Sequence, residues 1–292
     1  MVMVIKMNYL VFDIGGTSVK YAVIDNSLNF LLKNSFPTNA HLGAISILKE
    51  IAKKVKQLSS YQPKGLALTS GGAINSQTGL VLGASENIPS YIGINVIDFF
   101  QKEFNLPTTI LNDVNAVGLA ESKLGAGKNF NNLLILALGT GIGGALIINN
   151  KLYEGNYFGA AEFGKMIIEG NDWEATTSTK ALVSIIKTQR KVNNGLDVFK
   201  LYDEKDPFVK AEVDKFYYRL ALGIINLTYS FGPDIVIIGG AISNRKTFLK
   251  ELKEILIPLL PPFYQNNFKI DIAQYKNDAG MLGALIHHLN NK

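Results

Sequence analysis

The segment VFDIGGTSVKYAVID, residues 11–25, places two glycines and a threonine between two apolar stretches. Its pattern predicts two strands, 8–14 and 18–25, joined by a tight turn at Gly15, Gly16 and Thr17. The order recurs in LLILALGTGIGGALIINNKLYEG, residues 133–155, which reads as strand, glycine loop, strand, Asn149-Asn150 turn and strand. Two copies of this unit predict two related α/β halves.

The glycine loops allow three interpretations. Neither loop has the G-x-x-x-x-G-K-[ST] sequence of a P-loop. Gly139, Gly141 and Gly144 match a dinucleotide-binding fingerprint, but ALIINN follows where that fingerprint requires a helix. A hairpin whose turn amides bind phosphate fits both loops, because glycine lets the backbone approach an anion closely. For the first loop alone, an ordinary hairpin turn is equally consistent with the sequence.

Asp13 stands directly before the first loop. A carboxylate beside bound phosphates needs a cation between them, and Mg²⁺ held through water would serve. The alternative is an aspartate that only caps the turn.

The composition is that of a globular protein. Of 292 residues, 47% are hydrophobic and 18% charged, with a net charge of +5. The sequence has no apolar run of the roughly 20 residues that span a bilayer, and its start lacks a signal-peptide pattern. Met7 could open the first strand, which would make residues 1–6 dispensable. Basic and acidic residues are interspersed, which argues against a nucleic-acid surface. The sequence contains no cysteine, which excludes disulfides and thiolate metal sites and favours a cytoplasmic location.

The remaining periodicity predicts further elements. Apolar residues recur at helical spacing in several segments, and short apolar runs between them indicate buried strands. We expect strands at 28–36, 64–69, 109–111 and 234–240, and helices at 41–58, 96–104, 116–123, 177–191, 208–230, 244–258 and 279–290.

Four motifs in order resemble those of the ROK sugar kinases: D-I-G-G-T at 13–17, N-D-x-N-A at 112–116, G-T-G-I-G-G at 139–144 and A-E-F-G at 161–164. The resemblance covers essentially the whole chain. It implies a two-domain actin-like, ribonuclease-H-like ATPase fold with an interdomain cleft for ATP and a sugar. The expected domains are 1–112 with 279–292, and 113–278. The family also suggests a homodimer.

The resemblance assigns roles to matching positions. Asp113 aligns with the catalytic base. The phosphate loops and their neighbours comprise Gly15, Gly16, Thr17, Lys20, Thr140 and Gly141, and the adenosine end Gly239 and Gly240. Sugar contacts are expected from Gly72, Ser85, Asn87, Asn112, Glu162, Lys165 and Glu174.

Two departures from the family pattern bear on the substrate. Lys165 stands where the family usually has histidine, and the cysteine-rich zinc motif that normally follows is absent. The chain therefore resembles the subgroup without structural zinc, which includes β-glucoside kinases, and we expect the sugar's reducing end to be more open. Gly71 stands where many members have proline, so the local backbone is less fixed.

Each assignment has a simpler alternative. Asp113 could be a helix N-cap, because Asn-Asp precedes a helical segment. Glu162 and Glu174 could be surface carboxylates, and Lys165 could point to solvent. His41, His287 and His288 are expected at the surface, and adjacent helical histidines do not share a face for binding a metal.

The function that fits best is ATP-dependent phosphorylation of the 6-hydroxyl of a hexose or β-glucoside. N-acetylmannosamine kinase and fructokinase are alternatives within the family. A sugar-sensing repressor would need a DNA-binding module before the first hairpin, and only 12 residues precede Asp13. A non-catalytic sugar-binding protein is disfavoured because every expected catalytic position carries a competent residue.

Overall fold

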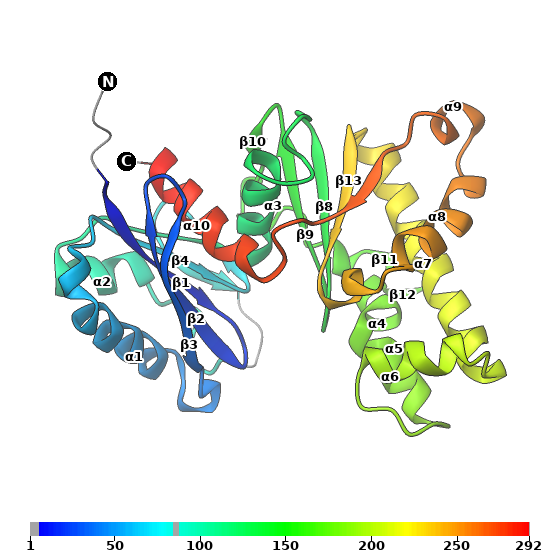
Figure 1. Ribbon diagram of the computed structural model, residues 1–292, viewed down its shortest axis with the longest axis horizontal. Coiled ribbons are helices and arrows are strands. Elements are labelled where there is room, and N and C mark those ends of the chain that lie inside the picture. Colours follow the sequence, from blue (N-terminus) through cyan, green and yellow to red (C-terminus); the bar gives the residue numbers. More distant parts are fainter. Residues whose placement is uncertain (1–5, 84–87, 292) are drawn as a thin grey trace. The chain divides into compact units, whose positions relative to one another are not determined.

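The computed structural model describes residues 6–83 and 88–291 (Figure 1). The chain divides into two compact units: unit 1 comprises Met1–Ala120, Glu154–Ala160 and Asn277–Lys292, and unit 2 comprises Glu121–Tyr153 and Ala161–Lys276. The domain bounds expected from the sequence stay a prediction.

Unit 1 is built on a five-stranded sheet in the order β3-β2-β1-β4-β7. The first hairpin pairs β1 with β2 antiparallel, whereas β1, β4 and β7 run parallel. The elements of this unit are β1 (Asn8–Ile14), β2 (Ser18–Asp25), β3 (Phe30–Pro37), β4 (Leu66–Ser70), β5 (Ala73–Ile74), β6 (Val81–Gly83), β7 (Thr108–Asn112), η1 (Ala40–Leu42), α1 (Ala44–Gln57), η2 (Ser59–Tyr61), α2 (Val96–Phe104) and α10 (Ala279–Asn290).

Both faces of this sheet are covered. Leu10 and Phe12 pack with buried residues of α1 and α2, whereas Tyr9 and Val11 pack with α10 on the opposite face. Strands buried on both sides read as continuous apolar runs, which is why β1 and β4 show little alternation of polar and apolar residues.

Unit 2 repeats the topology with the sheet order β10-β9-β8-β13-β14. Again the hairpin strands β8 and β9 are antiparallel, and β8, β13 and β14 are parallel. Its elements are β8 (Leu133–Leu138), β9 (Ile142–Ile148), β10 (Lys151–Leu152), β11 (Ile167–Ile168), β12 (Asn171–Asp172), β13 (Ile235–Gly239), β14 (Ile270–Ile272), η3 (Phe163–Lys165), η4 (Ala241–Asn244), α4 (Trp173–Thr177), α5 (Thr179–Lys187), α6 (Gly195–Asp203), α7 (Pro207–Phe231), α8 (Phe248–Leu259) and α9 (Pro262–Gln265). Helix α3 (Asp113–Lys123) and η5 (Lys276–Asp278) cross the boundary between the units.

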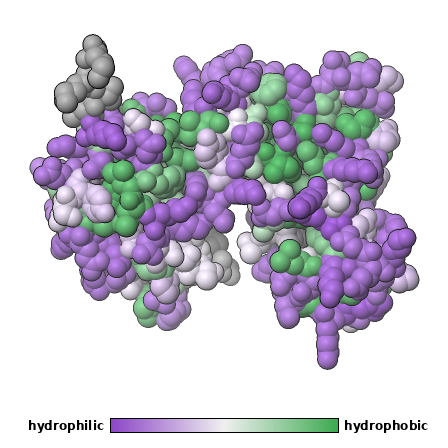
Figure 2. Space-filling model, viewed as in Figure 1, coloured by the Kyte–Doolittle hydropathy of each residue, from purple (hydrophilic) through white to green (hydrophobic). Residues whose placement is uncertain are grey.

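The shared strand order confirms the prediction of two related α/β halves. The Asn149-Asn150 turn is confirmed as well, because both residues have positive φ, 51° and 63°, as a two-residue hairpin turn requires. Among the described residues, no helix is both long and apolar enough to cross a membrane. On the face drawn in Figure 2, hydrophilic residues are spread over both units.

Four expected helices differ from those observed by three residues or more at one end. The helix expected at 116–123 begins earlier, at Asp113, directly after β7. The helix expected at 41–58 begins at Ala44, because Gly43 adopts a φ of 82° after the short η1. The helix expected at 177–191 is α5, which begins only at Thr179, after the extended Ser178 that caps it, and ends at Lys187; the separate α4 precedes it. The helix expected at 244–258 begins only at Phe248, because Arg245 is extended.

The surface position expected for His287 and His288 is wrong, whereas His41 is exposed as expected. His287 and His288 are only 8% and 1% exposed, because α10 packs along β1, β4 and β7. The His288 ring meets Tyr9 edge-on and its Nδ1 lies 3.0 Å from Thr109 Oγ1. Burial lowers the pKa of His287 to about 4.

The depressed pKa of His287 predicts a pH-dependent stability. Because the native state resists protonation, the stabilisation is present above pH 6.5 and is lost as the pH falls towards 4. The loss for this group is on the order of 3 kcal/mol. We expect the free energy of unfolding in urea to fall less between about pH 7.5 and about pH 4.5 in His287→Gln than in the wild type. The exposed His41→Gln is the control, and an equal fall in all three proteins would contradict the prediction.

Candidate active site

The parallel strands of unit 1 bring three loops to one sheet edge. In the register, Asp13 pairs with Thr69 and Ser70 pairs with Asn112, so β1, β4 and β7 end side by side. Loops at the carboxyl ends of parallel strands are the usual ligand sites of α/β folds. The structure therefore brings together the sequence-predicted residues of unit 1: Asp13, Gly15, Gly16, Thr17, Lys20, Gly72, Asn112 and Asp113.

The first glycine turn is closed by a hydrogen bond from Gly15 N to Ser18 O, 3.2 Å long. A Cβ on Gly15 would lie 2.9 Å from that same Ser18 oxygen, so the turn itself requires this glycine. Gly16 differs, because a Cβ there would have no atom within 4 Å and its φ is not positive. Gly16 and Thr17 are exposed at the tip. The geometry of the turn therefore does not itself require a glycine at position 16.

Asp13 is fixed beside this turn by two neighbours. Its Oδ1 accepts a hydrogen bond from Thr69 Oγ1 at 2.9 Å, and its Oδ2 lies 3.4 Å from Lys20 Nζ. Within the described residues, no group of three or more histidines, aspartates or glutamates could hold a metal. One carboxylate suits Mg²⁺ that keeps its waters and binds phosphate oxygens, so the residues fit that ion.

Asn112 and Asp113 divide two tasks at the start of α3. Asn112 Oδ1 accepts hydrogen bonds from Val114 N and Asn115 N, at 2.9 and 3.0 Å, and thereby caps the helix. Its Nδ2 donates to Gly72 O at 3.0 Å. The helix cap considered for Asp113 therefore falls mainly to Asn112, although Asp113 Oδ1 also accepts from Val114 N.

The second Asp113 carboxylate oxygen faces the turn after β4. A Cβ on Gly71 would lie 3.8 Å from Asp113 Oδ2. The next residue, Gly72, has a φ of 106°, which only glycine adopts readily. Two other expected sugar contacts, Ser85 and Asn87, lie outside the described residues.

In unit 2 the second glycine loop carries a carboxylate. Glu174 Oε2 accepts a hydrogen bond from Ile142 N at 3.2 Å, and a Cβ on Gly141 would lie 2.5 Å from that oxygen. Lys165 Nζ lies 2.5 Å from Glu174 Oε1. The structure thus pairs Lys165 with Glu174 next to Thr140 and Gly141, so Lys165 is not a lone solvent-directed cation.

Glu162 is exposed and lies near this pair. Its pKa is raised, first because neighbouring protein atoms displace water from the carboxyl group and then by the Glu174 charge; Lys165 opposes both effects. The hydrogen bond to Glu174 raises the pKa of Lys165. Three charged groups therefore influence one another beside the second glycine loop.

A cavity of about 1160 Å³ in unit 2 lies between α6 and the segment after Gly240. Its lining combines apolar, polar and charged side chains, including Thr179, Leu196, Phe199, Asp203, Ile242 and Arg245. Among the residues that the structure describes, Thr179 Oγ1 is buried without a hydrogen-bond partner. A concave site with an apolar body and a few polar groups suits a small-molecule ligand.

This cavity adjoins the second glycine loop. Lys180 N donates to Gly139 O, and a Cβ on Gly240 would lie 2.0 Å from Leu138 O. Gly239 and Gly240, expected near the adenosine end of a nucleotide, thus lead directly into the cavity wall at Ala241. The sequence analysis missed α6 and the residues it contributes. Asn194 was the available signal, because its side chain accepts from Leu196 N and Asp197 N as a helix cap does.

Residues 9–290 match the ROK family. The chain therefore belongs to the ROK family, as its four motifs indicated. A β-glucoside kinase of Listeria innocua is 32% identical over 98% of this chain and 99% of its own length.

Solved structures agree with this assignment. One from Listeria monocytogenes, described as a candidate N-acetylmannosamine kinase, has a TM-score of 0.89 and 31% identity, covering 98% of this chain and 99% of its own. A ROK family protein of Streptococcus pneumoniae, solved in complex with sucrose, has a TM-score of 0.87 and 28% identity with the same coverage. These similarities confirm the actin-like α/β fold class.

Substitution of Gly16 tests whether the first loop is more than a turn. Gly16→Ala has room for its Cβ, so we expect the melting temperature to stay close to that of the wild type. If the Gly16 backbone approaches phosphate, the added methyl group should raise KM for ATP by roughly 10- to 100-fold, the effect of losing a hydrogen bond to a charged group.

Gly240→Ala provides the contrast. Its Cβ would collide with Leu138 O and its φ is 91°, so this variant should lose thermal stability. If KM for ATP were unchanged in Gly16→Ala, the first loop would be a structural turn that does not bind phosphate through Gly16.

Proposed function

We propose that this chain, a sugar kinase of the ROK family, transfers the γ-phosphoryl group of ATP to the 6-hydroxyl of a β-glucoside, with Asp113 as the general base. The observation that carries the proposal is the position of Asp113. Asn112 caps α3 and binds Gly72 O, which leaves Asp113 Oδ2 facing the Gly71-Gly72 turn.

Asp113 is suited to accept a proton from the sugar. As the 6-hydroxyl oxygen attacks the γ-phosphorus, its proton moves to the Asp113 carboxylate. The bond between the γ-phosphorus and the β,γ-bridging oxygen breaks, and ADP leaves. Such transfers depend mainly on positioning and charge stabilisation. A carboxylate at the junction of a strand and a helix is held rigidly enough for this task.

The phosphate groups are assigned to the two glycine turns. In unit 1 these are the amides of Gly15 and Gly16, the Thr17 hydroxyl and Lys20; in unit 2 they are Thr140 and Gly141. Consecutive amides and a nearby cation favour anions. Asp13 would hold Mg²⁺ through water, and that ion would neutralise phosphate charge when bound. The Lys20 ammonium, 3.4 Å from Asp13, helps to offset the carboxylate's repulsion of phosphate.

The nucleoside is assigned to the cavity of unit 2. That cavity begins beside Gly139, the first residue of the second glycine loop, and Gly239 and Gly240 lead into its wall. Leu196 and Ile242 offer apolar surface to a flat ring, and Thr179 offers a hydroxyl group. This arrangement supports ATP as the phosphoryl donor.

The sugar is assigned to polar groups that can pair with its hydroxyl groups. These are the backbone of Gly72 and the side chains of Ser85, Asn87, Asn112, Glu162 and Glu174. Lys165 is proposed to act through Glu174, whose carboxylate it contacts.

A β-glucoside is supported by one relative, and a glucoside of either configuration by a second. The Listeria innocua protein is named a β-glucoside kinase, and the Streptococcus pneumoniae protein was solved with sucrose, in which the anomeric carbon of glucose is substituted. The absence of cysteine fits a subgroup without a structural zinc near the reducing end. N-acetylmannosamine is the second candidate, supported by the description of the Listeria monocytogenes structure. Glucose and fructose are further family substrates. We also propose a cytoplasmic homodimer, on the family resemblance and the lack of cysteine.

The base role of Asp113 is tested by Asp113→Asn. The amide keeps an oxygen for the hydrogen bond from Val114 N but cannot take the proton, so kcat should fall by roughly 10²–10⁴. Binding of ATP, measured by calorimetry, should not change. The measurement is ADP release coupled to a dehydrogenase on the best sugar.

Asp98→Asn is the matched control, because Asp98 also stands in the first turn of a helix in unit 1. It should retain full activity. A kcat near the wild-type value in Asp113→Asn would remove Asp113 from the base role.

A further inference from the structure

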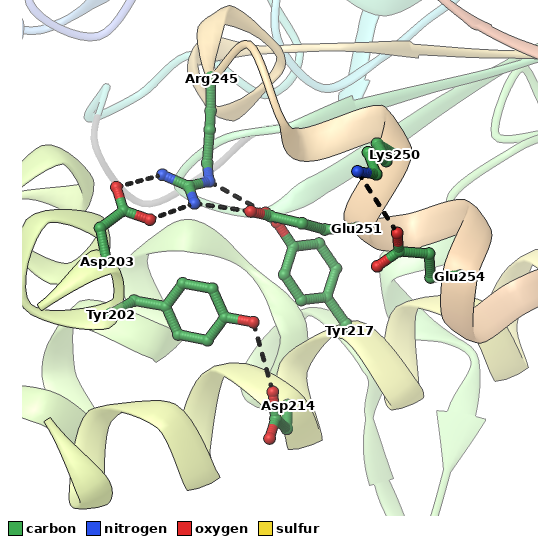
Figure 3. Close-up of polar contacts among 8 residues, drawn as sticks. All are labelled: Tyr202, Asp203, Asp214, Tyr217, Arg245, Lys250, Glu251 and Glu254. Atoms are coloured by element: carbon green, nitrogen blue, oxygen red, sulfur yellow. Dashed lines mark hydrogen bonds and ion pairs between the residues drawn. The ribbon is translucent and has the colours of Figure 1, made fainter. Parts of the chain in front are cut away.

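One end of the unit 2 cavity is formed by an arginine shared between two carboxylates (Figure 3). Arg245 donates from Nη1 and Nη2 to the two oxygens of Asp203, at 2.9 and 2.6 Å. It also donates from Nε and Nη2 to the two oxygens of Glu251, at 2.9 and 2.6 Å. Four of its hydrogen-bonding positions are thus used inside the protein.

The two carboxylates differ in their access to the cavity. The Asp203 side chain is 59% exposed, whereas those of Glu251 and Arg245 are 17% and 14% exposed. Glu251 lies on the side of the Arg245 guanidinium opposite Asp203 and also accepts from Tyr217 Oη. The Arg245 guanidinium stacks over Phe199, 4.8 Å from the ring centroid. Asp203 is therefore the member of the network that a ligand can reach.

Asp203 is ionised at neutral pH, and Arg245 favours that state further. Hydrogen bonding from Arg245 lowers the pKa of Asp203, outweighing the opposing effect of desolvation. An ionised carboxylate only accepts hydrogen bonds, and each oxygen retains capacity beyond its bond to Arg245. This end of the cavity thus selects an N–H or O–H donor. It does not suit phosphate, because the arginine is already engaged and the exposed charge is negative.

Asp203 lies at the end of the cavity away from the glycine loop. Helix α6 runs for nine residues from Gly195 to Asp203, about 13 Å. Its first residue packs on Thr179, which neighbours the contact of Lys180 with Gly139. A nucleotide with its phosphates at Gly139 would extend its base towards Asp203.

We propose that Asp203, oriented by Arg245, accepts a hydrogen bond from the exocyclic amino group of adenine and thereby makes the enzyme select ATP over 6-oxopurine nucleotides. Asp203 is the specificity residue, and Arg245 is a positioning residue that acts through it. This inference rests on the proposed function, because it requires that ATP binds in the unit 2 cavity. A 6-oxopurine would place an oxygen against the carboxylate, where two acceptors repel each other and leave one polar group unpaired.

The test compares ATP, ITP and 2′-deoxy-ATP, both in the kinase assay and by direct calorimetric binding without sugar. For the wild type, kcat/KM should be roughly 10- to 100-fold lower with ITP than with ATP, through KM. Asp203→Asn should reduce this ratio to near one, because its amide can donate to the inosine oxygen. Arg245→Lys replaces the guanidinium that binds both carboxylates by a single ammonium group. This variant should raise KM for ATP and reduce the ratio of kcat/KM with ATP to kcat/KM with ITP, while KM for the sugar stays unchanged.

Arg190→Lys is the matched control. Arg190 also forms a two-bond pair with an aspartate, Asp206, and lies over a phenylalanine ring, but it does not line the cavity. This variant should keep the wild-type preference for ATP over ITP, even if it loses some thermal stability.

Two results would overturn the inference. One is equal use of ATP and ITP by the wild type. The other is a loss with 2′-deoxy-ATP that disappears in Asp203→Asn, which would assign the carboxylate to the ribose instead. A wild type that binds ATP in preference to ITP but phosphorylates no sugar would support the inference and refute the proposed kinase activity, so the two failures are distinguishable.

Discussion

The parallel pairing of β4 with β1 and β7 determines where the candidate site residues of unit 1 lie. Because these strands run in the same direction, Asp13, the Gly71-Gly72 turn and the Asn112-Asp113 pair come to one edge of the sheet. The same arrangement of β8 and β13 in unit 2 brings the second glycine loop next to Gly240. Each unit thus presents its candidate functional loops where parallel strands end, and the first hairpin of each sheet supplies the glycine turn at that edge.

At these edges, some polar residues stabilise the local structure, and others are proposed to contact ligands. Asn112 satisfies backbone donors of α3 and binds Gly72 O, so Asn112 and not Asp113 is the main cap of this helix. Lys165 and Arg245 are placed in a similar way, because each forms an ion pair with a carboxylate at the candidate site. Lys165 pairs with Glu174, and Arg245 pairs with Asp203. Lys165 and Arg245 each bind a carboxylate that is assigned to a ligand, and Asn112 makes the capping bonds beside Asp113.

Much of the fold could be predicted from the sequence, because it is carried by local signals. The glycine hairpins, their repetition and the Asn149-Asn150 turn follow from backbone requirements that few other residues meet. The burial of His287 and His288 could not be predicted in this way. It depends on where α10 packs, and adjacent polar residues give no indication that all sides of a helix are covered.

The candidate site was predictable only in part, for a related reason. Motif residues such as Asp13 and Asp113 stand at strand ends that the pattern of the sequence reveals. The cavity in unit 2 depends on Asp203 and Arg245, which are 42 residues apart and meet only through tertiary packing. The pairing of Lys165 with Glu174 likewise depends on packing. Side-chain pairs of this kind do not follow the spacing of a helix or strand, so the sequence pattern does not reveal them.

The most direct test of the central claim is a comparison of sugars in the coupled ADP-release assay with Mg-ATP. Cellobiose and methyl β-glucoside would be measured beside glucose, fructose and N-acetylmannosamine, and the phosphorylated position would be identified by NMR. A β-glucoside kinase requires kcat/KM to be highest for the two glycosides, with phosphate on the 6-hydroxyl of the terminal glucose. Efficient turnover of glucose or N-acetylmannosamine with no detectable reaction of either glycoside would contradict it.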